Sequence, residues 1–471
     1  MTMTQKRLAI VCSYNESCGN ASYAHVLRNK FSEYVHCDVI PLDLFLLQKS
    51  SPAFQSAGDR HIAGIAARLA GYDYVNIQFE VGLYGAKDSV VLRRLKMLLD
   101  GCRNVVVTMH RINPPTFHLP RVLWQFAETF VAGHPIIATR ALLGEIFYMR
   151  PAAKLYSRII EACRGRSRSA NVSILVHTKR ERRIVKEIYG FDKVVDFPIT
   201  FLTEEQRRDV LEKTDVEAFR QRHGIAPGTK VIGAFGFISS YKGYETLIHA
   251  LKELPDDHHL YLFGGQHPAS VAENVPLDPY IESLLKLIRE KNEEVVVDAR
   301  RRLMPLGRGR IAPEHTGPEV AERVEDTLSK LLSYDLLKRV HFVGELSDPQ
   351  FIEALRGCDA VVLPYLEVGQ SMSGVIALAI ECGANLYCAR NRSFAEVMKY
   401  YGEVFVSFDI GNYVELAQKI QRGGNRFEEA RSRALATYNL HSNVALHLER
   451  MGFVLPAEAE LPRAGTMQPA A

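Results

Sequence analysis

Two series of short apolar runs, separated by amphipathic or glycine-containing segments, constrain this chain to an α/β architecture. Each run is apolar enough to be a strand buried on both faces. Strands that alternate with helical segments in this way predict parallel sheets covered by helices. The first series comprises Leu8 to Cys12, Asp38 to Ile40, Tyr74 to Phe79, Val105 to Met109 and Ser173 to Val176, and the second comprises Val231 to Phe235, Leu260 to Phe263, Val340 to Val343, Ala360 to Leu363, Asn385 to Cys388 and Val404 to Phe408.

The length of the chain supports two domains, because 471 residues is about three times the usual domain size of roughly 150. A charged stretch with Pro227 and Gly228 separates the two series and suits a helical edge followed by a linker. The tail after Pro456 is expected to be disordered, because its low apolar content cannot offset the entropy of ordering. We predict an N-terminal domain at 1–205, a C-terminal domain at 206–425 with an insertion at 270–335, and a last segment at 426–471 whose helices cross back to the first domain.

The composition is that of an ordinary globular protein, with 47% apolar and 24% charged residues. A formal net charge of +4 is too small to argue for a nucleic-acid partner. The eight cysteines are scattered without metal-like spacing and are expected to be reduced core thiols. No apolar run has the length of a signal-peptide core or a membrane span, so the expected location is cytoplasmic.

Two loops of the second series have the features of a diphosphate site, which requires backbone donors, a cation and a helix N-terminus. The segment Gly236 to Gly243 places Lys242 between a strand and a helix, at the sheet edge where doubly wound folds bind ligands. The segment Gln370 to Gly374 precedes an apolar helix, and its small residues let the helix amides approach a phosphate. A solvated lysine and a simple helix cap are the alternatives at this point.

The order of these motifs resembles the retaining GT-B glycosyltransferases, the large group that contains sucrose synthase and many bacterial polysaccharide mannosyl- and glucosyltransferases. The resemblance spans about residues 230–410 and implies two Rossmann-like domains that face each other across a cleft, with the nucleotide sugar bound by the second domain. It is carried, in order, by G-x-x-x-x-x-K-G at Gly236 to Gly243, Gly264 to Pro268, Phe342 to Leu346, Asp359 to Tyr365, Ser373 with Gly374, and Glu381 to Gly383.

The resemblance also implies roles for single residues. Lys242 would act on the diphosphate both as a catalytic and as a donor-binding residue. Gly19 corresponds to a glycine turn of the first domain that approaches the donor phosphates, and His110 to a strand-end histidine near the transferred sugar, although a structural role for His110 is an alternative. The other donor-binding candidates are Gly236, Gln370, Ser371, Met372, Ser373, Gly374 and Glu381.

The sequence departs from the family pattern at several positions. The two glutamates of the E-x(7)-E signature fall on Gln370 and Leu378, and Glu381, one turn later on roughly the same helix face, is the candidate replacement for the ribose-binding glutamate. Phe237 stands where an arginine often precedes the lysine, and Phe79 stands where a histidine is common. A bacterial subgroup shares the loss of the glutamates and of the arginine.

We therefore expect a hexosyltransferase that moves a sugar from a nucleotide-diphosphate sugar to a glycan or a lipid-linked acceptor, with retention, in bacterial polysaccharide or glycoconjugate synthesis. The leaving diphosphate would accept the acceptor's proton while Lys242 and the helix amides stabilise its charge, so neither a cofactor nor a metal is expected. The arginines between residues 300 and 310 are either a patch for a lipid-diphosphate acceptor at the inner membrane face or an ordinary soluble surface. The alternatives are a non-catalytic GT-B-like module that binds a partner or a glycan in a polysaccharide-assembly complex, which Leu378 and Phe237 favour, and an epimerase or phosphorylase on the same fold.

Overall fold

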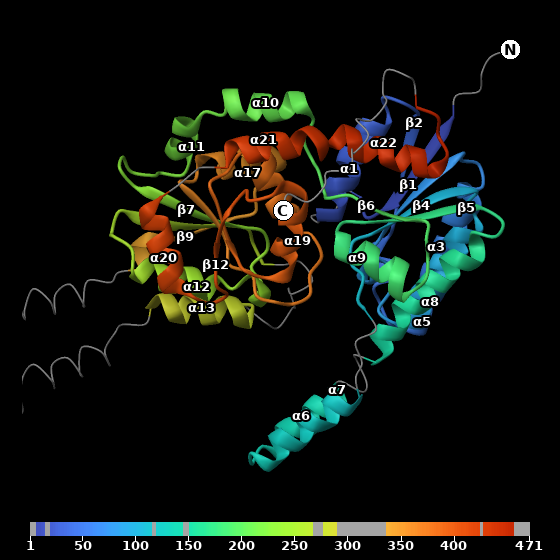
Figure 1. Cartoon of the computed structure of the whole chain (residues 1–471), viewed down its shortest axis with the longest axis horizontal. Coiled ribbons are helices and arrows are strands. Elements are labelled where there is room, and N and C mark those ends of the chain that lie inside the picture. Colours follow the sequence, from blue (N-terminus) through green and yellow to red (C-terminus); the bar gives the residue numbers. More distant parts are fainter. Residues whose placement is uncertain are drawn as a thin grey trace, which may run out of the picture.

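The structure is a computed structural model that describes residues 6–14, 19–114, 119–144, 150–266, 277–289, 336–423 and 427–455. Each half of the chain builds one parallel six-stranded sheet with helices on both faces (Figure 1). This confirms the predicted α/β architecture with two doubly wound units. The arginine-rich segment at 300–310 and the tail after Pro456 lie outside the described residues.

The first sheet has the strand order β2-β1-β3-β4-β5-β6, so the order reverses between β1 and β3. The predicted apolar runs are all strands here, and β6 was missed because it is short and ends in a charged residue. The strands are β1 (Arg7–Cys12), β2 (His36–Pro41), β3 (Tyr74–Phe79), β4 (Asn104–Met109), β5 (Asn171–Val176) and β6 (Val194–Asp196).

Helices α3, α5 and α8 pack together on one face of this sheet, and α1 lies on the other. Their apolar residues recur at helical spacing, for example Leu95, Leu98 and Leu99 on α5, which are buried against the strands. The helices of this half are α1 (Gly19–Phe31), α2 (Leu44–Leu47), α3 (Pro52–Leu69), α4 (Val81–Tyr84), α5 (Asp88–Asp100), α6 (Leu119–Val131), α7 (Pro135–Gly144), α8 (Arg150–Arg166), α9 (Lys179–Arg183) and the π-helical turn η2 (Ile184–Ile188).

The second sheet has the order β12-β11-β10-β7-β8-β9, which reverses between β7 and β10. All six predicted runs of the second series are strands. They are β7 (Lys230–Phe235), β8 (His258–Phe263), β9 (Val340–Gly344), β10 (Ala360–Leu363), β11 (Leu386–Ala389) and β12 (Val406–Phe408).

Helix α17 of the second half begins at a local sequence signal. Ser347 and Gln350 form a capping box, with Pro349 in the first turn of α17. The helices are α10 (Glu204–Lys213), α11 (Val216–Arg222), the 3₁₀ turn η3 (Ser240–Lys242), α12 (Tyr244–Lys252), α13 (Pro279–Arg289), α16 (Leu336–Arg339), α17 (Asp348–Gly357), α18 (Gly374–Glu381), α19 (Arg392–Tyr401) and α20 (Tyr413–Arg422).

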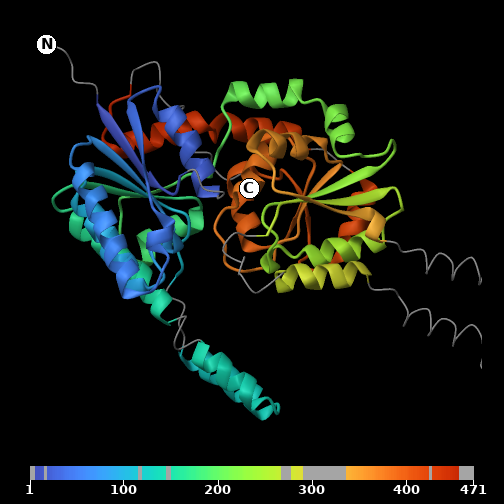
Figure 2. The ribbon, with the colours of Figure 1, turned by 180° about the vertical axis from the view of Figure 1, so that it is seen from behind.

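The last two helices pass from the second sheet to the first. Helix α21 (Glu428–Thr437) packs beside α19, whereas α22 (Leu440–Met451) packs against α1, β4 and β5 (Figure 2). On α22, the Asn443 side chain donates to the Tyr23 hydroxyl at 2.9 Å and to the Thr200 hydroxyl at 3.0 Å. The C-terminal helix is thereby tied to α1 and to the joining segment, residues 197–203, which connects β6 of the first half to α10 of the second.

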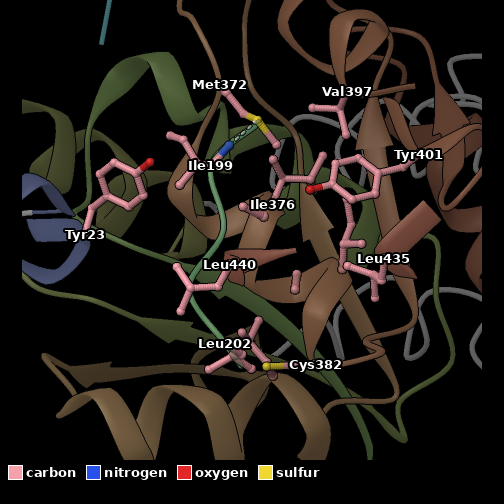
Figure 3. Close-up of a cluster of buried hydrophobic side chains, with 14 of the residues drawn as sticks. Tyr23, Ile199, Leu202, Met372, Ile376, Cys382, Val397, Tyr401, Leu435 and Leu440 are labelled. Carbon is pink, nitrogen blue, oxygen red and sulfur yellow. Dashed lines mark hydrogen bonds between the residues drawn. The ribbon is translucent and has the colours of Figure 1, made fainter. Parts of the chain in front are cut away.

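The two halves share one hydrophobic core, which extends from strand β1 of the first sheet to strand β10 of the second. Figure 3 shows its centre, where the joining segment passes between Tyr23 on one side and α18 and α19 on the other. The Ile199 amide donates to the Met372 sulfur at 3.3 Å, and Leu202 lies beside Cys382 in the same cluster. The seven cysteines that the structure describes are all buried with free thiols.

Candidate active site

A cavity of about 530 Å³ lies where the carboxyl ends of the two sheets meet. Its walls come from the loops after β1, β3 and β4 in the first half and after β7 and β10 in the second. The loops after β1 and β3, and those after β7 and β10, flank the points where the strand order of each sheet reverses. Doubly wound folds bind their ligands at such points. The lining residues are Gly19, Asn20, Tyr23, Glu80, His110, Arg111, Ile199, Phe201, Tyr241, Val368, Gln370, Ser371, Met372, Ser373 and Gly374.

Two helix N-termini border this cavity, one from each half of the chain. Helix α1 begins at Gly19, and α18 begins at Gly374 after the N-cap residue Ser373. Neither helix has an acidic residue in its first turn, and the Ser373 side chain makes no capping hydrogen bond to its own helix. Helix N-termini present free N–H groups and partial positive charge, so the cavity suits a bound anion.

The sequence predicted seven of these lining residues. Gly19 and His110 face the cavity from the first half, and the run from Gln370 to Gly374 faces it from the second. A Cβ atom on Gly19 would meet no atom within 4 Å, whereas one on Gly374 would lie 3.2 Å from the Phe201 ring. Gly19 therefore has free space beside it, while Gly374 allows α18 to approach the joining segment closely.

Lys242 lies just behind the cavity wall and does not line it. Its side chain is buried, and its Nζ donates to the Tyr365 hydroxyl at 2.6 Å and to the Phe235 carbonyl at 3.3 Å. Burial lowers the pKa of the Lys242 ammonium to about 7. The residue is adjacent to the start of α18, because a Cβ on Gly236 would lie 3.0 Å from Lys242 Nζ and 3.6 Å from a methyl of Val375.

Glu381 is placed elsewhere than its expected position on the donor. The carboxylate is buried at the end of α18 and accepts hydrogen bonds from the backbone N–H groups of Phe201, at 2.9 Å, and Leu202, at 3.3 Å. Burial raises the pKa of Glu381 to about 8, against the opposing effect of these hydrogen bonds. Glu381 thus fixes the joining segment on α18 and does not line the cavity. The expectation that Glu381 replaces the ribose-binding glutamate was wrong, because the joining segment covers the face of α18 on which Glu381 lies.

A chain of hydrogen bonds runs from α22 to His110 and fixes the proton position on each ring. His447 Nδ1 donates to the Asn443 carbonyl, the Thr108 hydroxyl donates to His447 Nε2 at 3.1 Å, and Asn76 donates to Thr108 at 3.0 Å. Gln78 then donates to Asn76 and accepts from His110 Nε2 at 2.7 Å. The directions are consistent only if His110 carries its proton on Nε2, which leaves Nδ1 as an acceptor.

The His110 ring is kept neutral. Desolvation, together with the neighbouring rings of His177 and His447, holds the pKa of His110 well below its usual value. The His110 and His177 rings lie 5.0 Å apart, and both have an edge-to-face contact with Tyr23. His110 can therefore accept or donate a hydrogen bond at physiological pH without carrying charge.

Sequence reasoning missed the two charged side chains that line the cavity, Glu80 and Arg111. Glu80 follows directly on β3 and Arg111 is the second residue after β4. Their place at the ends of parallel strands was the signal that could have identified them. Arg111 is on the first half but donates to the Val368 carbonyl of the second half at 3.4 Å. Burial raises the pKa of Glu80, and the Arg111 charge opposes this rise.

Solved structures resemble this chain over almost its whole length, whereas no protein-family model matches it and no curated protein is a significant match. HepE from Anabaena, in complex with UDP and glucose, superposes with a TM-score of 0.56 at 15% identity over 96% of this chain and 100% of that chain. The sucrose-phosphate synthase of Thermosynechococcus elongatus gives 0.54 at 14% identity over 95% and 98%. A UDP-forming α,α-trehalose-phosphate synthase from Burkholderia xenovorans gives 0.52 at 12% over 96% and 100%.

The fold is GT-B. Full-length coverage of both chains in each pair, with two parallel six-stranded sheets, confirms the fold class that the motif order indicated. Among the described residues, no group of three or more His, Cys, Asp or Glu side chains is arranged to hold a metal ion. Within the same residues, every helix is too short or too polar to cross a membrane.

Proposed function

We propose that this GT-B chain is a glycosyltransferase that takes a sugar from a nucleoside-diphosphate sugar bound in the 530 Å³ cavity. The observation that carries the proposal is the pair of helix N-termini, at Gly19 and Gly374, that border one cavity from opposite halves. An anion between them would receive free N–H groups from both domains. Neighbouring folds include HepE in complex with UDP-glucose, which supports a UDP-sugar as the first donor to test.

The donor's diphosphate would lie at the start of α18, with Lys242 as its closest buried cation. Lys242 would turn from Tyr365 toward the phosphates and stabilise the charge that develops on the leaving group. Because Phe237 occupies the position of the family's usual arginine, we propose that Arg111 supplies the second positive charge from the opposite domain. Arg111→Gln should then lower kcat/KM for the donor about tenfold or more, and an unchanged kcat/KM would remove Arg111 from the mechanism.

His110 would contact the transferred sugar, since it faces the cavity from the first half of the chain. Its neutral ring with an unprotonated Nδ1 can accept a hydrogen bond from a sugar hydroxyl. The acceptor that we propose is a glycan or a lipid-linked sugar, transferred with retention and without a metal, and the leaving diphosphate takes the acceptor's proton. Retention is checked by the anomeric proton coupling of the product in NMR spectra.

The decisive experiment uses two glycine substitutions with equal space around them. A Cβ atom on Gly19 or on Gly64 meets nothing within 4 Å, but only Gly19 of these two faces the cavity. Gly19→Leu should abolish UDP binding in calorimetry, and Gly64→Leu, on the exposed face of α3, should leave it unchanged. Equal UDP affinity in both variants would contradict the donor site.

Turnover separates the enzyme from a binding module, the alternative that Phe237 and Leu378 favour. Release of UDP from UDP-sugars in the presence of a mixture of sugar and lipid-linked acceptors supports the enzyme. Specific UDP-sugar binding that Gly19→Leu abolishes, with no transfer at millimolar donor, supports a non-catalytic module.

A further inference from the structure

Helices α6 and α7 form a helical hairpin that stands clear of both sheets in the two opposite views (Figures 1 and 2). Within residues 122–143, Val122 and Ala138 are the buried side chains. Most of the hairpin's large apolar side chains are exposed, and the most exposed lie at its tip, with Val131 86% and Ile136 75% exposed. The exposed set is Leu123, Trp124, Phe130, Val131, Ile136, Ile137 and Leu143.

This amount of exposed apolar surface on so short a segment marks an interaction surface. The tip from Phe130 to Thr139 contains no Asp, Glu, Lys or Arg, and the imidazole of His134 is its most polar side chain. The whole hairpin, residues 119–144, has three charged residues, Arg121, Glu128 and Arg140. Its polarity therefore increases from an apolar tip toward the base.

The base of the hairpin leads into α8, where Lys154 and Arg158 are exposed. Arg140 on α7 is a third exposed basic group. The exposed acidic groups in the same part of the chain are Glu128 and Glu161. An apolar end followed by a basic zone matches the order of a bilayer surface, which has acyl chains inside and anionic headgroups outside.

We propose that the α6–α7 hairpin inserts its apolar tip into the surface of an anionic lipid bilayer. Helix α6 has 13 residues and is about 20 Å long, too short for the roughly 30 Å hydrocarbon core. The tip therefore enters one leaflet only. Val131, Ile136 and Ile137 would reach the acyl chains, while Lys154 and Arg158 stay at the headgroups.

The position of the hairpin relates this surface to the cavity. His110 and Arg111, which line the cavity, follow β4, and helix α6 begins at Leu119. The hairpin therefore belongs to the first half of the chain and follows the cavity loop after β4. If the proposed transfer holds, a lipid-linked acceptor would approach from this side. The membrane surface itself does not depend on that function, because vesicle binding is measured without donor.

Trp124 provides a specific probe, because it is the only tryptophan in the sequence and is 68% exposed. Vesicles of phosphatidylcholine with about 30% phosphatidylglycerol should shift its emission to the blue and shield it from acrylamide, and pure phosphatidylcholine should do so less. No change with anionic vesicles would overturn the proposal. A blue shift that grows with protein concentration in the absence of lipid would assign the surface to a second copy instead.

Paired variants test the two layers by vesicle co-sedimentation. Val131→Ser/Ile136→Ser should weaken vesicle binding roughly tenfold or more. The control Leu337→Ser/Val454→Ser changes two exposed apolar residues elsewhere and should leave vesicle binding unchanged. Lys154→Gln/Arg158→Gln should weaken binding to the anionic vesicles about tenfold and leave the weak binding to neutral ones unaltered. All four residues of the first two variants are exposed, so circular dichroism should show unchanged folding. Equal loss in the control variant would overturn the proposal.

Discussion

The hydroxyl of Ser371 donates a hydrogen bond of 2.8 Å to Oε2 of Glu181, on helix α9 of the other half of the chain. The same carboxylate accepts from the Ile112 amide at 3.1 Å and from the Thr178 hydroxyl at 2.9 Å. Burial raises the pKa of Glu181 to about 7, although these three hydrogen bonds and the Arg180 charge oppose the rise. The loop that borders the cavity is thereby fixed to the first domain through a buried group.

Ser371→Ala removes this contact between the domains. The free energy of unfolding should fall by about 1 kcal/mol, the usual net value of one hydrogen bond, because Glu181 keeps its other two donors. Urea denaturation measures the change, with Ser283→Ala on the exposed side of α13 as the control, since Ser283 bonds only to its own helix. If both variants were equally stable, the Ser371 contact would contribute nothing.

The titration of Glu181 should make stability depend on pH. Its folded pKa of about 7 lies above the ordinary 4.5, so between these values the folded state holds a proton that the unfolded chain has lost. The contribution of Glu181 is then full below pH 4.5 and is lost as pH rises through 7. Relative to Glu181→Gln, the parent should lose on the order of 3 kcal/mol between pH 4.5 and 8, measured by urea unfolding.

The comparison of parent and variant isolates this group. His177 and His447, whose pKa values burial lowers to about 4, titrate below neutral pH in both proteins and cancel in the difference. A difference that stays constant from pH 4.5 to 8 would contradict the raised pKa of Glu181.

The strands could be predicted from the sequence because their signal is local. The runs Tyr74 to Phe79 and Ala360 to Leu363 are strands with the predicted bounds, since a strand buried on both faces is continuously apolar. The start of α18 after Ser373 was equally readable from its small residues. These features depend on neighbours in the sequence.

The roles of the buried charged groups could not be predicted, because they depend on contacts between distant segments. Glu381 accepts a hydrogen bond from the Phe201 amide, which lies 180 residues away in the sequence. Lys242 donates to the Tyr365 hydroxyl, 123 residues away. Arg111 sits next to His110 in sequence, but only the approach of the second domain shows that it borders the cavity. Helix periodicity gives a residue's face and does not show which segment covers that face.

His110 should act in turnover and not in nucleotide binding. His110→Ala is expected to lower kcat while the dissociation constant of UDP stays nearly unchanged, because the residue faces the cavity from the first half. Steady-state kinetics and calorimetry measure the two quantities. Parallel loss of kcat and UDP affinity, or a collapse of the melting temperature, would indicate a structural role.

Gln78 should position His110 through the hydrogen bond to Nε2. In Gln78→Glu an ionised carboxylate would favour the imidazolium, so the pKa of His110 rises and the acidic limb of the kcat profile moves to higher pH. A purely structural role of Gln78 would change stability without moving this limb. Asn29→Asp, an amide-to-acid change on the exposed face of α1, is the control.

Lys242 should couple UDP binding to proton uptake. Burial lowers its pKa to about 7, so above neutral pH the free protein holds it mostly uncharged, whereas a diphosphate at the start of α18 favours the ammonium. UDP affinity should therefore fall as pH rises from 7 to 9, by up to about tenfold per pH unit. The terminal phosphate of UDP loses its last proton near pH 6, so the ligand's charge is constant in this window. Calorimetry in buffers of different ionisation enthalpy counts the protons taken up.

Lys242→Met should weaken UDP binding at pH 7 by about 1.5 to 3 kcal/mol and flatten the pH dependence, while Glu181 and Glu381 titrate alike in both proteins. Equal affinity of the parent at pH 7 and 9, or a variant that binds as tightly as the parent, would place the diphosphate away from Lys242.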